Sequence, residues 1–140
     1  MRYDPIRVGQ ILGLSPRPST YSVMEAAIRA GFPKAALYNV TNLIESEPGN
    51  ARELAYAVVP KSTLSRRETL TPEQSERTER LARLFAQAEQ VFGDANDARD
   101  FMHRAHPELE GRRPLDVAAT ELGARNVERV LNAAEFGLPV

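Results

Sequence analysis

The segment between Thr71 and Gly93 constrains the fold more than any other part of the chain, because it has the pattern of one long amphipathic helix. It starts with Thr71-Pro72-Glu73-Gln74, which places a capping hydroxyl, a proline and a reciprocal amide at the positions where helices begin. Apolar residues then recur three and four positions apart, namely Leu81, Leu84, Phe85, Ala88, Val91 and Phe92. Gly93 ends this pattern, so the segment is predicted to be a single helix.

Start and stop signals of the same kind predict further helices on both sides. Ser22 with Glu25 forms a capping box for a helix that ends at Gly31. Pro33 begins another helix, which lasts until Pro48. Shorter helices are predicted near residues 51–58 (behind Asn50 and Glu53), 61–68, 95–105, 115–122 (before Gly123) and 127–134 (before Gly137).

Two further features complete the fold prediction. Residues 1–20 contain five prolines and glycines and are predicted to be an irregular arm. No stretch shows sustained two-residue alternation of apolar and polar side chains, which a half-buried strand requires. The predicted fold class is therefore all-α.

Composition excludes several classes of protein. The 140 residues include no cysteine, so disulfides and thiolate metal sites are absent. No apolar run approaches the roughly 20 residues of a membrane span, and the N-terminus lacks the apolar core of a signal peptide. The chain is therefore expected in the cytoplasm without a membrane partner.

Charge is distributed unevenly along the chain. Residues 1–70 carry nine Lys/Arg and six Asp/Glu, a balance of +3, and residues 71–140 carry nine and thirteen, a balance of −4. This asymmetry is compatible with two surfaces that bind different partners, and equally with ordinary solvated charge.

No residue pattern in the chain indicates catalysis. There is no glycine-rich phosphate loop, and the serines have no histidine partner in their sequence context. His103 and His106 could share a metal ion, but no third ligand accompanies them, and a cation at a helix C-terminus is the interpretation that the spacing favours. The chain is predicted not to be an enzyme and to hold no cofactor and no metal.

A helix-turn-helix pattern makes DNA a candidate partner. The helix at 51–58 is followed by a break at Val59-Pro60 and by a short second helix with basic and hydroxyl side chains. The candidate DNA-binding residues are Lys61, Ser62, Thr63, Ser65, Arg66 and Arg67. Two alternatives stay open: a packed helix pair with a solvated basic face, and a structural role for Arg66 and Arg67 through Glu53 or Glu68.

Several motifs, in order, resemble one family of regulators. They are Thr63-Leu64-Ser65-Arg66-Arg67, the segment 70–77, the Phe92-Gly93 end of the long helix, the segment 109–116, and the closing Glu121-Leu122-Gly123 and Glu135-Phe136-Gly137-Leu138-Pro139. Together they resemble the Xre-type antitoxins of RES–Xre type II toxin–antitoxin pairs, also called the ParS/Xre toxin-binding family. Phe101-Met102 departs from this pattern, because the family more often has Trp-Leu there.

The resemblance implies a domain organisation and a set of partners. Behind the arm predicted for residues 1–20, it implies an Xre-like helix-turn-helix region over 21–70 and a helical toxin-binding domain over 71–140 packed with it. The implied partners are a RES-domain toxin, which is an ADP-ribosyltransferase-like enzyme that consumes or transfers from NAD, a second copy of the chain in a homodimer, and operator DNA in autorepression. The alternative is a stand-alone helix-turn-helix transcriptional regulator that has no toxin.

The last helix and the tail are the predicted toxin-binding site. The candidate residues are Arg125, Glu128, Arg129, Asn132, Glu135, Phe136, Gly137, Leu138, Pro139 and Val140. Phe136, Leu138 and Val140 give this tail more apolar surface than a solvated terminus needs, and Pro139 reduces the entropy lost when the tail is ordered. We expect the tail to occupy the toxin's NAD cleft, with the terminal carboxylate paired to a toxin arginine.

Overall fold

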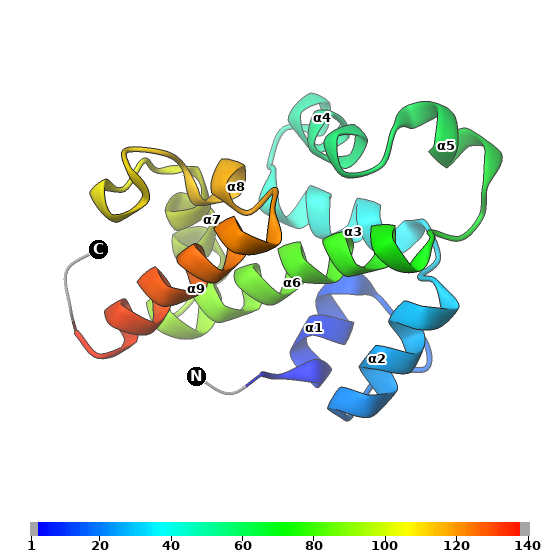
Figure 1. The fold of residues 1–140 in the computed structure, drawn as a ribbon, viewed down its shortest axis with the longest axis horizontal. Helices are drawn as coiled ribbons and strands as arrows, with labels where there is room; N and C mark the ends of the chain where they lie inside the picture. Colours follow the sequence, from blue (N-terminus) through cyan, green and yellow to red (C-terminus); the bar gives the residue numbers. More distant parts are fainter. Residues whose placement is uncertain (1–2, 138–140) are drawn as a thin grey trace. The chain divides into compact units, whose positions relative to one another are not determined.

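The structure, a computed structural model that describes residues 3–137, confirms the all-α fold class (Figure 1). Its elements are α1 (Pro5–Leu12), α2 (Tyr21–Ala30), α3 (Ala35–Ile44), α4 (Pro48–Val58), α5 (Lys61–Arg66), α6 (Pro72–Phe92), α7 (Ala95–His103), a 3-10 turn η1 (Pro107–Leu109), α8 (Pro114–Val117) and α9 (Glu121–Glu135). No described helix is long and apolar enough to cross a membrane.

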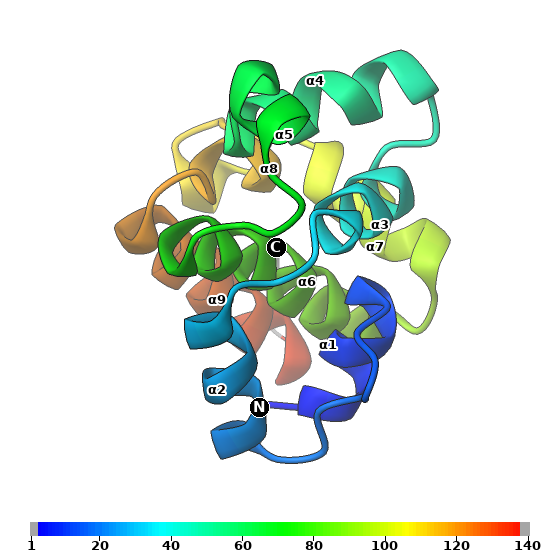
Figure 2. The ribbon, with the colours of Figure 1, turned by 90° about the vertical axis from the view of Figure 1, so that its right-hand side faces the viewer.

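The described chain divides into two compact units, residues 3–82 and residues 83–137, and the division falls inside α6. In the first unit α1 and α4 both pack against α3, and Figure 2 shows α4 and α5 at the end of this unit opposite the α1–α2 loop. Its core is apolar and includes Val8, Leu12, Phe32, Leu37, Val40, Ile44 and Leu64. The domain limits expected from the sequence, 21–70 and 71–140, stay a prediction.

In the second unit α7, α8 and α9 pack together around aromatic and aliphatic side chains. The Phe92 and Phe101 rings lie 5.3 Å apart, and the Phe101 ring lies 4.7 Å from the buried His106 ring. Val127 and Leu131 of α9 are fully buried in this core. One face of α9 is therefore fixed by apolar packing.

The start of α6 confirms the strongest sequence prediction. The Thr71 backbone N–H donates to the side-chain oxygen of Gln74 over 2.9 Å, and the Gln74 N–H donates to the Thr71 hydroxyl over 3.1 Å. This reciprocal pair satisfies two backbone donors that would otherwise lack partners. Gly93 follows the helix with φ +103°, a conformation that favours glycine.

The prediction of an irregular arm over residues 1–20 is wrong, because residues 5–12 form α1. Its start is a cap-and-proline pair: the Asp4 carboxylate accepts from the Arg7 backbone N–H over 3.1 Å, and Pro5 is the first helical residue. Val8 and Leu12 are 1% exposed, so α1 belongs to the core. The sequence prediction counted the prolines and glycines of this segment and did not consider that Asp4-Pro5 is a helix start.

Two predicted helix boundaries in the first unit are also corrected. Thr20, rather than Ser22, caps α2, since its hydroxyl accepts from the Val23 backbone N–H over 3.2 Å. Pro33 does not begin α3; it lies two residues before that helix, in an isolated antiparallel bridge with Thr69. At the start of α2 the Val23 backbone N–H thus binds Thr20, and the backbone of residues 32–34 binds residues 68–70 and does not start a helix.

Further corrections concern α4 and α9. Pro48 begins α4 rather than ending α3, and no side chain caps this helix, so the box predicted at Asn50 and Glu53 is not formed. Gly123 lies in the first turn of α9 and does not end a helix. A Cβ atom at Gly123 would collide with the backbone carbonyl of Val117, so the close approach of α8 and α9 explains this glycine.

Candidate functional site

The predicted DNA-binding residues lie on α5 and directly after it. Pro60 precedes the helix, and Leu64 is its buried side chain, 3% exposed. Thr63 is half-buried; the other five candidates are exposed, namely Lys61, Ser62, Ser65, Arg66 and Arg67. The structure therefore places a short polar helix with a basic residue at each end on the surface of the first unit, behind the turn that the sequence predicted.

Hydrogen bonds within α5 order part of this surface. The Ser65 hydroxyl donates to the Ser62 carbonyl over 2.9 Å, and Nε of Arg66 donates to the same carbonyl over 3.1 Å. Nζ of Lys61 lies 6.0 Å from the centre of the Tyr56 ring. The Arg66 bond uses Nε, which leaves its two terminal amino groups for other acceptors such as phosphate or guanine.

Two cations that the sequence analysis did not select bind the carbonyl ends of the helix-turn-helix pair. Nη1 of Arg77, on α6, donates to the Val58 carbonyl at the end of α4 over 3.3 Å. Nζ of Lys34 donates to the Leu64 carbonyl in α5 over 3.1 Å. No local pattern could have revealed these contacts, because each joins residues far apart in the sequence.

The second candidate surface is the outer face of α9. The helix begins at Thr120, whose hydroxyl accepts from the Gly123 backbone N–H over 3.0 Å. With the apolar face buried, exposed residues recur at helical spacing on the other side, among them Leu122, Arg125, Asn126, Arg129 and Phe136, and Glu121 and Glu135 are exposed beside them. Leu122 is 78% exposed and Phe136 is 80% exposed, so an apolar side chain marks each end of this face.

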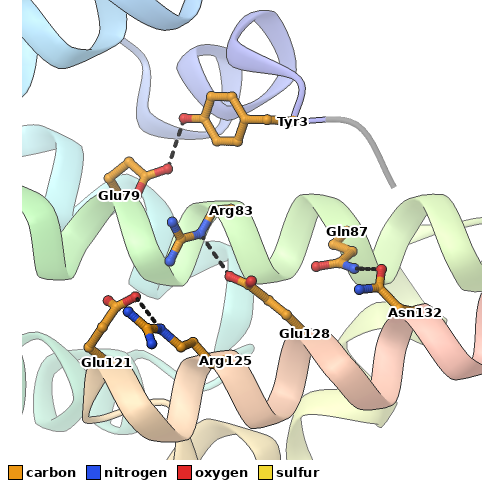
Figure 3. A network of polar contacts seen from close by, with 8 residues as sticks. All are labelled: Tyr3, Glu79, Arg83, Gln87, Glu121, Arg125, Glu128 and Asn132. Carbon is orange, nitrogen blue, oxygen red and sulfur yellow. Dashed lines mark hydrogen bonds and ion pairs between the residues drawn. The ribbon is translucent and has the colours of Figure 1, made fainter.

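Two polar contacts hold the flank of α9 against the second half of α6 (Figure 3). The Arg83 guanidinium lies 3.2 Å from the Glu128 carboxylate, and both side chains are about 30% exposed, at 28% and 32%. The Gln87 amide donates to the Asn132 side-chain oxygen over 3.0 Å. Glu128 and Asn132, which were selected as toxin-binding candidates, therefore bind α6 in this structure.

The two arginines of the outer face have contacts within α9 itself. Nε of Arg125 lies 3.8 Å from the Glu121 carboxylate, and this side chain is 73% exposed (Figure 3). Arg129 donates through Nε and Nη2 to the Asn126 side-chain oxygen over 3.3 and 3.0 Å. Such exposed contacts are weak, so both guanidinium groups can exchange them for a partner's carboxylates.

The remaining tail candidates divide into two groups. Glu135, Phe136 and Gly137 are exposed at the end of α9. Leu138, Pro139 and Val140 lie outside the described residues, and so does the predicted contact of the terminal carboxylate. Leu122 and Asn126 are exposed on the same face but were not among the predicted residues, although Leu122 lies in a motif that carried the family resemblance.

Neither histidine takes part in a metal-like cluster among the described residues, where no group of three His, Asp or Glu side chains gathers. Nδ1 of His103 lies 2.7 Å from the Arg99 carbonyl, and Nε2 of His106 lies 3.2 Å from the Phe101 carbonyl. A bidentate hydrogen bond from Arg113 lowers the pKa of Asp116 at the start of α8. These contacts stabilise helix ends.

Comparisons with known proteins match two stretches of the chain, one containing α5 and the other α9. A family model described as the Antitoxin Xre-like helix-turn-helix domain matches residues 23–83, which include α5. A second, the Antitoxin Xre/MbcA/ParS C-terminal toxin-binding domain, matches residues 87–137, which include α9. A curated relative named Antitoxin Xre, from Pseudomonas putida, is 34% identical over 71 residues; these are 51% of this chain and only 45% of that relative's length.

Proposed function

Because the chain belongs to the Xre family of antitoxins, we propose that it neutralises a RES-domain toxin by docking the outer face of α9 onto it and inserting the following residues into its NAD cleft. Antitoxins of this family are regulators rather than enzymes, in agreement with the sequence prediction. The toxin in this proposal is an ADP-ribosyltransferase-like enzyme that consumes or transfers from NAD.

The observation that supports this proposal best is the exposure of Phe136. An aromatic side chain that is 80% exposed offers a partner a large apolar area to bury. Arg125 and Arg129 lie on the same exposed side, and arginine and aromatic residues are the types that most often dominate binding energy. α9 is also held against α6 by Glu128 and Asn132, so little order has to be gained on binding.

Removal of Leu138–Val140 tests the occlusion of the cleft. We expect the shortened chain to keep its helical circular dichroism signal and still co-purify with the toxin encoded beside it, because α9 is intact. NAD consumption by the toxin should reappear, because the cleft is open. A shortened chain that still inhibits fully would exclude the tail as the occluding element.

We also propose that α5 reads operator DNA, so that the chain represses its own operon in the cytoplasm. The supporting observation is the exposure of Lys61, Arg66 and Arg67 on and after one short helix. Replacing Arg66 and Arg67 with alanine should reduce the salt dependence of binding to the upstream DNA by about two units, one for each phosphate contact. If the salt dependence and the affinity are both unchanged, Arg66 and Arg67 do not contact the DNA and belong to the solvated surface.

A homodimer forms part of the same proposal. The net charge of +3 in residues 1–70 is small for neutralising phosphates, and a dimer doubles it. Light scattering of the purified chain measures its mass directly; a monomer at all concentrations, with or without DNA, would contradict this step.

The alternative function is a stand-alone transcriptional regulator, which would use the same exposed α5 to bind DNA. Co-expression with the neighbouring gene product separates the two proposals. A stoichiometric complex with a RES-domain enzyme supports the antitoxin, whereas DNA binding with no co-purified partner supports the stand-alone regulator.

A further inference from the structure

The helix that carries the DNA-binding candidates is too short to stabilise itself. α5 has six residues and buries one side chain, Leu64. Nucleating a helix fixes several residues for each hydrogen bond formed, and the last carbonyls of every helix lack partners within it. The position of α5 therefore has to be set by contacts from elsewhere in the fold.

Lys34, just before α3, supplies contacts of this kind. Its Nζ donates to the Leu64 carbonyl over 3.1 Å and lies 3.8 Å from the Glu68 carboxylate. Its backbone N–H donates to the Glu68 carbonyl over 3.1 Å. One residue thus binds both α5 and the chain that leaves it.

The segment around Lys34 is itself held firmly against the start of α6. The Leu70 backbone N–H donates to the Phe32 carbonyl over 2.8 Å, and Pro33 is bridged to Thr69. The Phe32 backbone N–H donates to the Ser75 hydroxyl over 2.9 Å in a buried position. These contacts between residues 32–34 and residues 68–75, which we call the clamp, hold the backbone from which the Lys34 side chain reaches α5.

A glycine immediately before the clamp supports the same view. Gly31 has φ +91°, and a Cβ atom there would collide with the Leu70 carbonyl. Gly31 is therefore required for the close approach of the two segments, although the sequence pattern predicted it only as a helix stop.

We propose that Lys34 is a positioning residue for DNA reading: it holds α5 in its binding orientation by capping the Leu64 carbonyl and does not contact phosphate. This inference rests on the proposed operator binding by α5. A lysine with 31% side-chain exposure that donates to the carbonyl of the buried Leu64 is a poorer phosphate ligand than the exposed Arg66 and Arg67.

Lys34→Met tests this role, because methionine keeps an apolar stem and removes the donor. Arg17→Met is the matched control: it removes the same charge from the α1–α2 loop, which lies at the other end of the unit from α5 (Figures 1 and 2). Lys34→Arg restores a charged donor. Binding is measured by fluorescence anisotropy, over a range of salt concentrations, on the DNA duplex upstream of the chain's own gene and on a scrambled duplex.

We expect Lys34→Met to reduce the preference for the upstream duplex about tenfold, the equivalent of one charge-assisted hydrogen bond. Amide hydrogen exchange at residues 64–70 of the free protein should become faster, and Lys34→Arg should restore both properties. Arg17→Met should leave preference and exchange unchanged. Should Lys34→Met fail to fold, Lys34→Leu, which also keeps an apolar stem and lacks a donor, takes its place in the same comparison.

Three results would overturn the inference. Equal weakening on both duplexes, with a salt slope lower by about one unit, identifies Lys34 as a phosphate contact. Faster exchange with unchanged preference shows a role in stability only, and no change in either property shows no role. If the wild-type chain itself does not prefer the upstream duplex, the proposed DNA reading fails. If the wild type prefers this duplex and Lys34→Met keeps that preference, only the inference about Lys34 fails.

Discussion

Phe136→Ala is the sharpest test of the toxin-binding surface, because it separates binding from folding. The side chain is 80% exposed at the end of α9, so its removal takes away almost no contact within the chain. Surface substitutions of this kind change the free energy of unfolding by less than about 0.5 kcal/mol. Removal of the buried Phe101, by comparison, should cost about 3–5 kcal/mol of folding free energy.

The effect on binding follows from the area that the toxin can cover. A phenylalanine offers about 150–250 Å² for burial, and four-fifths of it is available at Phe136. At about 25 cal/mol per Å², covering this area contributes at most about 3–5 kcal/mol. Allowing for incomplete burial, a loss of about 2–4 kcal/mol corresponds to a Kd weakened roughly 30- to 1,000-fold.

Isothermal titration calorimetry against a catalytically inactive form of the neighbouring toxin measures this change. Tyr21→Ala is the matched control, because Tyr21 is also an exposed aromatic residue, at 64%, and lies in the other unit. We expect Tyr21→Ala to bind like the wild type. Wild-type affinity for Phe136→Ala would refute the assignment of this end of α9 to the interface.

Three further predictions concern stability. Gly123→Ala should lower the free energy of unfolding by at least about 2 kcal/mol in a denaturant titration, since its Cβ would collide with the carbonyl at the end of α8. Gly49→Ala, whose Cβ would meet only the end of the Arg52 side chain at 4.0 Å, should be nearly neutral. A double-mutant cycle of Glu128→Gln and Arg83→Met should give a coupling of about 0.5–1.5 kcal/mol across their 3.2 Å ion pair, and a value near zero would contradict the pair. The hydrogen bond from Arg113 lowers the pKa of Asp116 below its ordinary 3.8. The stability that this ion pair contributes is therefore present above about pH 4 and is lost as pH falls through the lowered pKa. With 57% exposure this loss should stay below about 1 kcal/mol and vanish in Asp116→Asn; identical acid melts for both chains would refute it.

The candidate sites were predictable only in part. The basic and hydroxyl residues that follow Pro60 were enough to predict a short helix there, and α5 lies at this place with most of these side chains exposed. The toxin-binding residues on α9 stay a prediction, and the sequence did not indicate which of them face the neighbouring helix. Glu128 and Asn132 bind α6, while Leu122, which lies in one of the motifs of the family resemblance, is exposed.

Amino-acid order by itself determined the features that depend on residues three or four positions apart. The capping pair of Thr71 and Gln74, the apolar stripe behind it and the glycine that ends it are all local, so the all-α class could be predicted from them. Tertiary structure alone decided which polar groups meet over long separations. Lys34 caps a carbonyl 30 residues away, and Gln87 binds a side chain 45 residues away. Each of these partners competes with local caps and with water, and packing of the apolar cores brings them within hydrogen-bonding distance.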